Sequence, residues 1–243
     1  MTSVIEHYES HLAPIYVWMA GGADAALARG RAEVEAVCPR PSPLQWAVDL
    51  GAGFGMHAIP LADLGYSVLA IDSSGTLLDV IKNHAGGKTI LTVQDDLLSF
   101  RNHLTVPVAL CVCMGDTLTH LPDCQSVEQL IANVAEALVH GGTFIVSFRD
   151  YSTPLAGPKR FIPVRSSSDR ILTCFLEYED DAVTVHDILH ERAGSEWHQT
   201  VSAYRKLRLS PEWVTRALEA KGLLVTRDRG LAGMIRFIAK RPL

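Results

Sequence analysis

A glycine-rich turn is the part of the sequence whose residue types point most directly to chemistry. Gly51-Ala52-Gly53-Phe54-Gly55 follows a predicted strand, Trp46–Leu50, which contains Asp49, and precedes a predicted helix, Met56–Leu64. Glycine lets the backbone approach a ligand where a Cβ would clash, and a helix start offers free N–H groups. Two ligands compete for such a turn. A dinucleotide requires G-x-G-x-x-G, whereas here Met56 occupies the place of the third glycine.

The turn resembles motif I of the class I methyltransferases that depend on S-adenosyl-L-methionine (SAM). The resemblance extends over residues 45–150 and the C-terminal end of the chain. It implies that the turn and the preceding acid hold the amino-acid part of SAM. The residues given this role are Asp49, Gly51, Ala52, Gly53 and Gly55.

Acidic residues follow the next two predicted strands, Ser67–Ile71 and Thr89–Val93. Because parallel strands end at one edge of their sheet, these side chains are expected to converge on one crevice with the glycine turn. The resemblance implies that Asp72 accepts from the ribose hydroxyls, with helix capping as the alternative. One of the next two acids would accept from the adenine amino group, and Leu97 packs on the base or in the core. The candidates at this edge are Asp72, Ser73, Asp95, Asp96 and Leu97.

Two further stretches follow predicted strands Val108–Met114 and Thr143–Phe148 and are similar to the glycine N-methyltransferase group. Residues 115–121 take the place of a Gly-Asn-Ser-x-x-His-Leu stretch, and residues 148–151 that of His-Arg-Asn-Tyr. The departures from this pattern are Asp116, Thr117 and Phe148. The transferable methyl would point to the end of the fourth strand. The candidate cofactor contacts there are Cys113 and Met114.

Three residues in these stretches are candidates for contact with the methyl acceptor: Asp116, His120 and Arg149. By the resemblance, Arg149 holds an anionic group such as a carboxylate, with a salt bridge to Asp150 or another surface acid as the alternative. Asp116 would orient an amine or hydroxyl nucleophile. His120 is either a general base with a pKa near neutrality or a structural residue bonded to backbone. The structural role is favoured, because transfer from a sulfonium needs little acid–base help.

The elements that must position these residues alternate between strand and helix, which predicts parallel strands with right-handed crossovers. The further predicted elements are helices Thr76–His84 and Ser126–Leu138, a helix from Ser210 to Gly222, and strands Leu223–Arg227 and Met234–Lys240. Ser210 is the expected N-cap of the last helix, with Pro211 at its first position. By the family resemblance the fold is α/β and Rossmann-like, with a seven-stranded, mostly parallel sheet of order 3-2-1-4-5-7-6.

The chain is predicted to divide into four parts. They are an N-terminal helical lid and linker (1–43), the SAM-binding core (44–150), an antiparallel β insertion after the fifth strand (151–209), and a helix and hairpin completing the core sheet (210–243). Residues 3–37 are predicted helical, with a break at Ala20-Gly21-Gly22. Aromatic side chains in this segment cover SAM or simply pack in the core. The lid candidates are Tyr8, Tyr16 and Trp18.

The predicted insertion begins with a stretch rich in Pro, Gly and Ser, residues 151–170. The segments Ile171–Tyr178, Val183–His190 and His198–Leu209 then alternate between apolar and polar residues, which predicts antiparallel strands. The insertion would either roof the acceptor pocket or form a contact in a homodimer.

Composition narrows the range of expected binding partners and cellular locations. The net charge is −5, and the longest basic cluster, Arg205-Lys206-Leu207-Arg208, is predicted to form the solvated face of a strand, so nucleic acid is not an expected partner. The chain has no apolar run near the roughly 20 residues of a membrane span and no signal-peptide pattern, so no membrane partner and a cytoplasmic location are expected. The five cysteines lack disulfide or metal spacing, and Cys111 and Cys113 are expected in the core.

The predicted function is methyl transfer from SAM to a small-molecule acceptor, first at an amine nitrogen and next at a hydroxyl or thiol. A nicotinamide-dependent oxidoreductase is the rival enzyme, opposed by Met56 and by the lack of a Tyr-x-x-x-Lys relay. The alternative that is not an enzyme is a protein that binds SAM without turnover.

Overall fold

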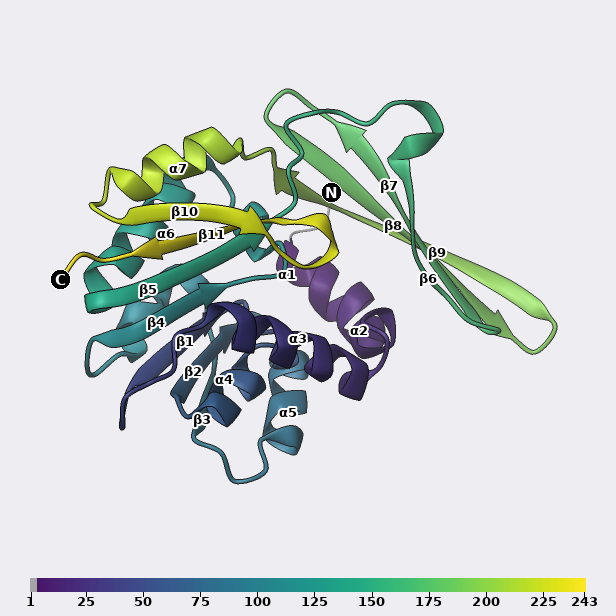
Figure 1. Ribbon diagram of the computed structural model, residues 1–243. Helices are drawn as coiled ribbons and strands as arrows, with labels where there is room; N and C mark the ends of the chain where they lie inside the picture. The colour runs from purple at the N-terminus through teal and green to yellow at the C-terminus, as the bar shows by residue number, and fades with distance from the viewer. Residues whose placement is uncertain (1–3) are drawn as a thin grey trace.

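Helices cover both faces of one large sheet, and a second sheet projects beyond its edge (Figure 1). The structure is a computed structural model that describes residues 4–243. Ser3, where the predicted helical stretch begins, therefore lies outside the described residues. Within the described chain, no helix is long and apolar enough to cross a membrane.

The large sheet has seven strands in the order β10-β11-β5-β4-β1-β2-β3. The strands are β1 (Trp46–Leu50), β2 (Ser67–Asp72), β3 (Ile90–Gln94), β4 (Val108–Cys113), β5 (Leu138–Phe148), β10 (Leu224–Arg229) and β11 (Ile235–Lys240). β1 to β5 are parallel, while β11 pairs antiparallel with both β5 and β10. Since β10 and β11 are the last two strands of the core, the predicted order 3-2-1-4-5-7-6 is confirmed.

The helices lie where the alternation of strand and helix predicts them. They are α1 (Val4–His7), α2 (Ala13–Met19), α3 (Ala23–Val37), α4 (Ala58–Leu64), α5 (Gly75–His84), α6 (Cys124–Ala137) and α7 (Pro211–Glu219). The side chain of Ser210 accepts from the Trp213 N–H and caps α7, as expected. The predicted break before α3 is also present, because Gly21 and Gly22 have φ of 94° and 95°, where an L side chain is strained.

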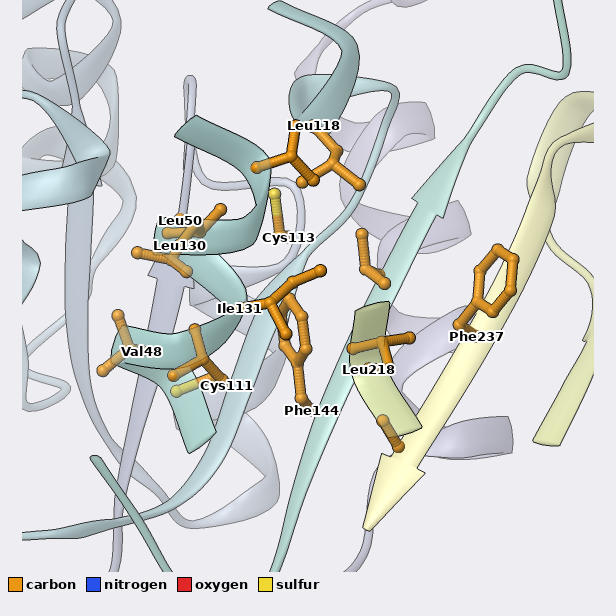
Figure 2. Packing of buried hydrophobic residues seen from close by; sticks show 14 of the residues in the cluster. Val48, Leu50, Cys111, Cys113, Leu118, Leu130, Ile131, Phe144, Leu218 and Phe237 are labelled. Atoms are coloured by element: carbon orange, nitrogen blue, oxygen red, sulfur yellow. The ribbon is translucent and has the colours of Figure 1, made fainter. Parts of the chain in front are cut away.

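The core has two layers, one on each face of the large sheet. Val48 and Leu50 point to the layer of α6 and α7, whereas Ala47 points to the layer of α3 and α4. Figure 2 shows the first layer, in which Cys111 and Cys113 pack among leucine and phenylalanine side chains. Both thiols are free and fully buried, as predicted, and burial raises the pKa of each.

The second sheet is antiparallel, in the order β6-β7-β8-β9. Its strands are β6 (Phe161–Ser166), β7 (Arg170–Tyr178), β8 (Ala182–Ala193) and β9 (Glu196–Leu207). β6 was not predicted, because it lies in the stretch rich in Pro, Gly and Ser. Pro163 is tolerated there since β6 is an edge strand, and the register shifts between Pro163 and Arg165.

The N-terminal segment crosses the inner face of this second sheet. Between α1 and α2 the chain forms a π-helical turn, Tyr8–Leu12, in place of the continuous helix predicted. Leu12 and Ile15 pack against Leu172 and Leu189 of β7 and β8. The segment is therefore held by the insertion, and it lies close to the edge where the parallel strands end (Figure 1).

Candidate functional site

The glycine turn is tied to the end of the neighbouring strand β2. The N–H groups of Gly51 and Ala52 both donate to the carbonyl of Ile71 at 2.9 Å. The N–H of Gly53 donates to Oδ2 of Asp72 at 2.7 Å. The other oxygen of Asp72 accepts from the N–H of Ser74 at 2.9 Å. The predicted juxtaposition of the turn and this acid is therefore present.

The glycines of the turn are required for different reasons. A Cβ at Gly51 would lie 2.3 Å from a methyl carbon of Thr117, and one at Gly55 would lie 2.9 Å from Ile81, so these two permit close packing. A Cβ at Gly53 would meet nothing within 4 Å, although its φ is +53°. The backbone at Gly53 thus faces open space and is available to a ligand.

The capping alternative for Asp72 is wrong. Ser74 is the N-cap of α5, and its side chain accepts from the N–H of Leu77. Burial raises the pKa of Asp72, with Glu9 of the N-terminal segment adding a like charge. One oxygen of Glu9 accepts from the Thr76 hydroxyl at 3.2 Å, while its Oε1 is buried and has no partner in the described part of the chain. The sequence reasoning missed Glu9, which only the fold brings beside Asp72.

Asp49 lies beneath the turn and is 1% exposed. Within residues 4–243, its buried Oδ2 has no hydrogen-bond partner. Burial raises the pKa of Asp49 to about 6, and the nearby His57 opposes that rise. A buried carboxylate oxygen without a donor is costly, so this atom is suited to a donor brought by a ligand.

The two acids after β3 have partners within the protein. The carboxylate of Asp95 accepts from the His103 ring at 2.7 Å, and this bond lowers the pKa of Asp95. The carboxylate of Asp96 accepts from the N–H of Leu98 at 2.7 Å and caps a short 3-10 helix, Leu97–His103. Leu97 is half-buried and packs against the main core layer. Their predicted contacts with adenine stay predictions.

Asp116 is held by four donors at the end of β4. Oδ1 accepts from the N–H of Arg149 at 2.9 Å, and the Thr119 hydroxyl lies 3.2 Å from Oδ1 while donating to the backbone carbonyl of Asp116 at 2.7 Å. Oδ2 accepts from Lys206 Nζ at 2.5 Å and from the Tyr151 hydroxyl at 3.2 Å. Burial alone would raise the pKa of Asp116, but the charge of Lys206 holds it below its usual range. Asp116 is therefore a buried, ionised and hydrogen-bonded carboxylate.

The prediction that the basic cluster at residues 205–208 forms a solvated face is wrong for Lys206. This residue is 7% exposed, and burial acts against its charge, but the carboxylate of Asp116 raises its pKa on balance. Alternate side chains of a strand face opposite ways, so Lys206 points inward from β9 while Arg205 points outward to Asp181 at 2.8 Å. The alternation visible in the sequence predicts opposite faces, but not which face is covered.

A series of ring contacts joins this ion pair to the glycine turn. Tyr204 lies 5.6 Å from Lys206 Nζ and 6.2 Å from Tyr8, measured from ring centroids. Tyr8 lies 5.9 Å from Tyr16, which in turn makes an edge contact with Phe54 of the turn at 5.8 Å. Two of the predicted lid aromatics therefore lie between the turn and the ion pair.

The third lid candidate, Trp18, lies elsewhere. Its ring packs beside Arg165 and Arg170 of the second sheet, with centroid distances of 5.7 and 5.9 Å. A surface hollow of about 430 Å³, lined in part by Glu136 and His140, is also remote, because it lies where β5 begins.

His120 ends a 3-10 helix, Thr117–His120, and its ring contacts Tyr8 at 5.3 Å and Tyr204 at 5.5 Å. The expectation of a pKa near neutrality is wrong. Burial and then the positive charge of Lys206 lower the pKa of His120 to about 3, although Asp116 opposes them. The imidazole is therefore neutral throughout the physiological range.

Arg149 bonds to Asp116 through its backbone N–H, whereas its guanidinium bonds elsewhere. Arg149 is exposed, and its guanidinium donates to the carbonyl of Ala232 at 3.2 Å; within residues 4–243 it forms no salt bridge, so the Asp150 alternative is wrong. Cys113 and Met114 have buried side chains in the two core layers, so only their backbone reaches the site. The backbone carbonyl of Ser73 accepts a hydrogen bond from the side-chain amide of Gln94.

The N-terminal segment is fixed to the second sheet by His7, which the sequence reasoning did not identify. The ring bonds to Asp187 Oδ2 at 2.9 Å through Nε2 and to the Ser202 hydroxyl at 2.7 Å through Nδ1. Since a carboxylate only accepts, Nε2 carries the proton and Nδ1 accepts from Ser202. His7 is fully buried and stacks on Tyr204 at 4.1 Å. This contact fixes the position of Tyr8, the next residue.

Comparison with known sequences agrees with this geometry. A family model described as a methyltransferase domain matches residues 47–142. Glycine N-methyltransferase of Mus musculus is 27% identical over 143 residues, which are 52% of this chain and 49% of that protein. The chain spans about half the length of the curated relatives it matches.

Solved structures match nearly the whole chain. The CcbJ methyltransferase of Streptomyces caelestis superposes with a TM-score of 0.78 at 19% identity, over 97% of this chain and 98% of that one. CalS10 of Micromonospora echinaspora, an amino pentose methyltransferase solved with SAM bound, gives a TM-score of 0.69 at 15% identity, over 95% and 97% of the two chains. At these identities the likeness establishes the fold, and the predicted Rossmann-like class is confirmed.

Proposed function

Since the chain carries a class I SAM-dependent methyltransferase domain, we propose that it transfers a methyl group from SAM to a small-molecule acceptor, first at an amine nitrogen. The observation that carries this proposal is the bond between the Gly53 N–H and Asp72, beside open space at Gly53. A hydroxyl or a thiol is the next choice of acceptor atom.

The residues present fit SAM as a ligand. The amino-acid part of SAM carries an ammonium group, and Asp49 has a buried carboxylate oxygen that no donor satisfies. The backbone at Gly53 has room for a ligand against it. Asp72 would accept from the ribose hydroxyls, and Glu9 adds a second unpartnered oxygen at the same strand end. We therefore assign Asp49, Gly53, Asp72 and Glu9 to the cofactor.

The chemistry that SAM supplies is an electrophilic methyl group on a sulfonium. The protein's part is to position the acceptor and to exclude water. The rings of Tyr8, Tyr16 and Tyr204 link the turn to the Asp116–Lys206 pair, and burial raises the pKa of each phenol, so all three stay neutral. Neutral His120 adds no charge beside these rings, and the transfer does not require it as a base.

The choice of nitrogen rests on the similar proteins. Those named here are a glycine N-methyltransferase and an amino pentose methyltransferase, and both names describe an amino-bearing small molecule. The predicted absence of nucleic-acid and membrane partners, the cytoplasmic location and the homodimer are kept as parts of the proposal.

The test is calorimetric titration with SAM, S-adenosylhomocysteine and NAD⁺ in parallel. Micromolar binding of the two adenosyl ligands without NAD⁺ is expected. Binding of NAD⁺ alone would overturn the proposal. Incubation with methyl-labelled SAM and a panel of amines then separates an enzyme from a protein that binds SAM without turnover, since only an enzyme forms a labelled product.

A further inference from the structure

We propose that Lys206 binds the methyl acceptor, through N–H groups that Asp116 does not use, and that the group it binds is an uncharged oxygen, a hydroxyl or carbonyl, near the methylated atom. The inference rests on the proposed function, because it places the acceptor beside the same methyl donor. It differs from the prediction that Arg149 binds an anionic acceptor.

Asp116 is not free to bind an acceptor itself. A carboxylate offers about four lone-pair sites; Arg149, Tyr151 and Lys206 occupy three of them, and the Thr119 hydroxyl, which donates at 2.7 Å to the backbone carbonyl of Asp116, lies beside the fourth. Its side chain is 5% exposed. An incoming amine would have to displace Arg149, Thr119, Tyr151 or Lys206. The carboxylate therefore acts as the support that holds the ammonium of Lys206 in place.

Lys206, in contrast, has donors to spare. An ammonium carries three N–H groups, and the described residues give it one hydrogen-bond acceptor, Oδ2 of Asp116. The Tyr151 hydroxyl donates to the same carboxylate at 3.2 Å, and the centroid of the Tyr204 ring lies 5.6 Å from Lys206 Nζ. The Lys206 side chain is 9% exposed, so water has little access to the remaining N–H groups. Buried ammonium N–H groups without acceptors are costly, and a ligand oxygen satisfies them.

The position of this ammonium is on the acceptor side of the site. The N–H of Asp116 donates to the carbonyl of Ser147, so the ion pair lies at the edge where β4 and β5 end. The ring contacts through Tyr204, Tyr8 and Tyr16 connect it to Phe54 of the glycine turn. A molecule lying between the turn and Lys206 would pass along these rings, whose faces suit the carbon skeleton of an acceptor.

The charges around Lys206 favour a neutral group. Asp116 already neutralises the ammonium, His120 is neutral, and the phenols of Tyr8, Tyr151 and Tyr204 are neutral. Asp187 on the same face of the second sheet is paired with His7. A carboxylate on the acceptor would put two carboxylates on one buried ammonium, and like charges at one buried site repel. A hydroxyl or carbonyl oxygen takes the same hydrogen bond without that cost.

The presence of this buried pair is itself informative. Burying two opposite charges gives little net stability, and apolar residues of similar size often replace such a pair without loss. The pair joins Lys206 of β9 to Asp116 after β4, 90 residues away in the sequence, and it meets at the acceptor edge. Binding of a ligand explains its presence better than stability does.

The experiment compares acceptors in matched pairs that differ only in charge. Amino acids and their primary amides, and amino sugars and the corresponding amino uronic acids, are incubated with SAM and protein, and methyl transfer is followed by mass spectrometry. The neutral member of each pair is expected to be methylated faster, by at least about tenfold in kcat/KM. Preference for the acids, or methylation of neither set by a protein that binds S-adenosylhomocysteine, would overturn the inference.

The variants assign the effect to the residue. In Lys206→Met, kcat/KM for the preferred neutral acceptor is expected to fall about 100-fold, while the Kd for S-adenosylhomocysteine stays within about twofold. Lys206→Arg is expected to recover part of the loss. Because Met at this position leaves Asp116 unpaired, the double variant Asp116→Asn/Lys206→Met provides a folded comparison without either charge. Lys221→Met, at an exposed position after α7, is the matched control.

Two failures can be told apart. If wild-type protein does not bind S-adenosylhomocysteine, the proposed function fails and the acceptor inference falls with it. If binding is normal and Lys206→Met and the double variant methylate neutral acceptors as fast as wild type, the role of Lys206 alone is refuted.

Discussion

The N–H of Gly53 donates to Oδ2 of Asp72 across 2.7 Å, which connects the turn after β1 to the end of β2. This bond sets the shape of the turn and holds one oxygen of Asp72 at the open space beside Gly53. The two candidate cofactor elements are thus one unit, and a change in the acid alters the turn as well as the contact with ribose.

Asp72→Ala is expected to weaken SAM binding by about 10- to 100-fold, because it removes a charged hydrogen-bond acceptor worth roughly 1.5–3 kcal/mol. Calorimetry with SAM measures the change. Asp79→Ala, at an exposed position on α5, is the control. Unchanged affinity in Asp72→Ala would show that the ribose is placed wrongly.

Asp49→Asn is expected to raise stability above pH 6 while weakening SAM binding. The folded pKa of Asp49, about 6, lies above its usual 3.8, so ionisation opposes folding. This cost is absent below about pH 3.8 and grows as the pH rises to about 6, where it reaches about 3 kcal/mol at about 1.4 kcal/mol per pKa unit. Melting curves at pH 4 and pH 7.5 test it, and an equal difference in Tm at both pH values would contradict it.

A plot of kcat/KM against pH is expected to show no titration of His120 near pH 6–7, since the folded pKa of His120 is about 3. Its depressed pKa also makes the fold sensitive to acid. The associated stability is fully present above the unfolded pKa of about 6.5 and is lost as the pH falls towards 3. His120→Phe should therefore lose less stability than wild type between pH 7 and pH 4. A wild-type limb near pH 6.5 that disappears in this variant would instead identify His120 as the base.

Arg149→Ala is expected to change the acceptor KM by less than about threefold, because its exposed guanidinium donates to a backbone carbonyl. Steady-state kinetics of Arg149→Ala and Lys206→Met, measured side by side, show which of the two cations binds the acceptor. A tenfold rise in the acceptor KM at unchanged SAM affinity would support the anion-binding role predicted for Arg149.

His7→Phe is expected to loosen the N-terminal segment, because it leaves Asp187 buried without its ring partner, at a cost of about 3 kcal/mol. Faster limited proteolysis at the break at residues 20–22 and about tenfold weaker S-adenosylhomocysteine binding should accompany a lower Tm. His198→Phe, at an exposed position on β9, is the control. A lower Tm with normal cofactor binding would reduce His7 to a purely structural residue.

Local sequence determined those features of this protein that depend on residues close together in the chain. Apolar strands and their alternation with helices predicted a parallel sheet, whose strand order was implied by the family resemblance, and Asp72 was placed beside the turn because parallel strands end at one edge. The Ser210 cap and the break at Gly21-Gly22 followed from residue type alone. These features arise from backbone preferences and from the side-chain period, which a linear pattern contains.

Only the tertiary structure decided which polar groups are buried together. Lys206 and Asp116 are 90 residues apart, and His7 and Asp187 are 180 apart. The period of a strand assigns Lys206 and Arg205 to opposite faces, but the N-terminal segment and the end of β4 determine which face loses its water. Burial then sets the charge state, as the lowered pKa of His120 shows. Desolvation depends on every neighbour in space, and the sequence around one residue does not contain those neighbours.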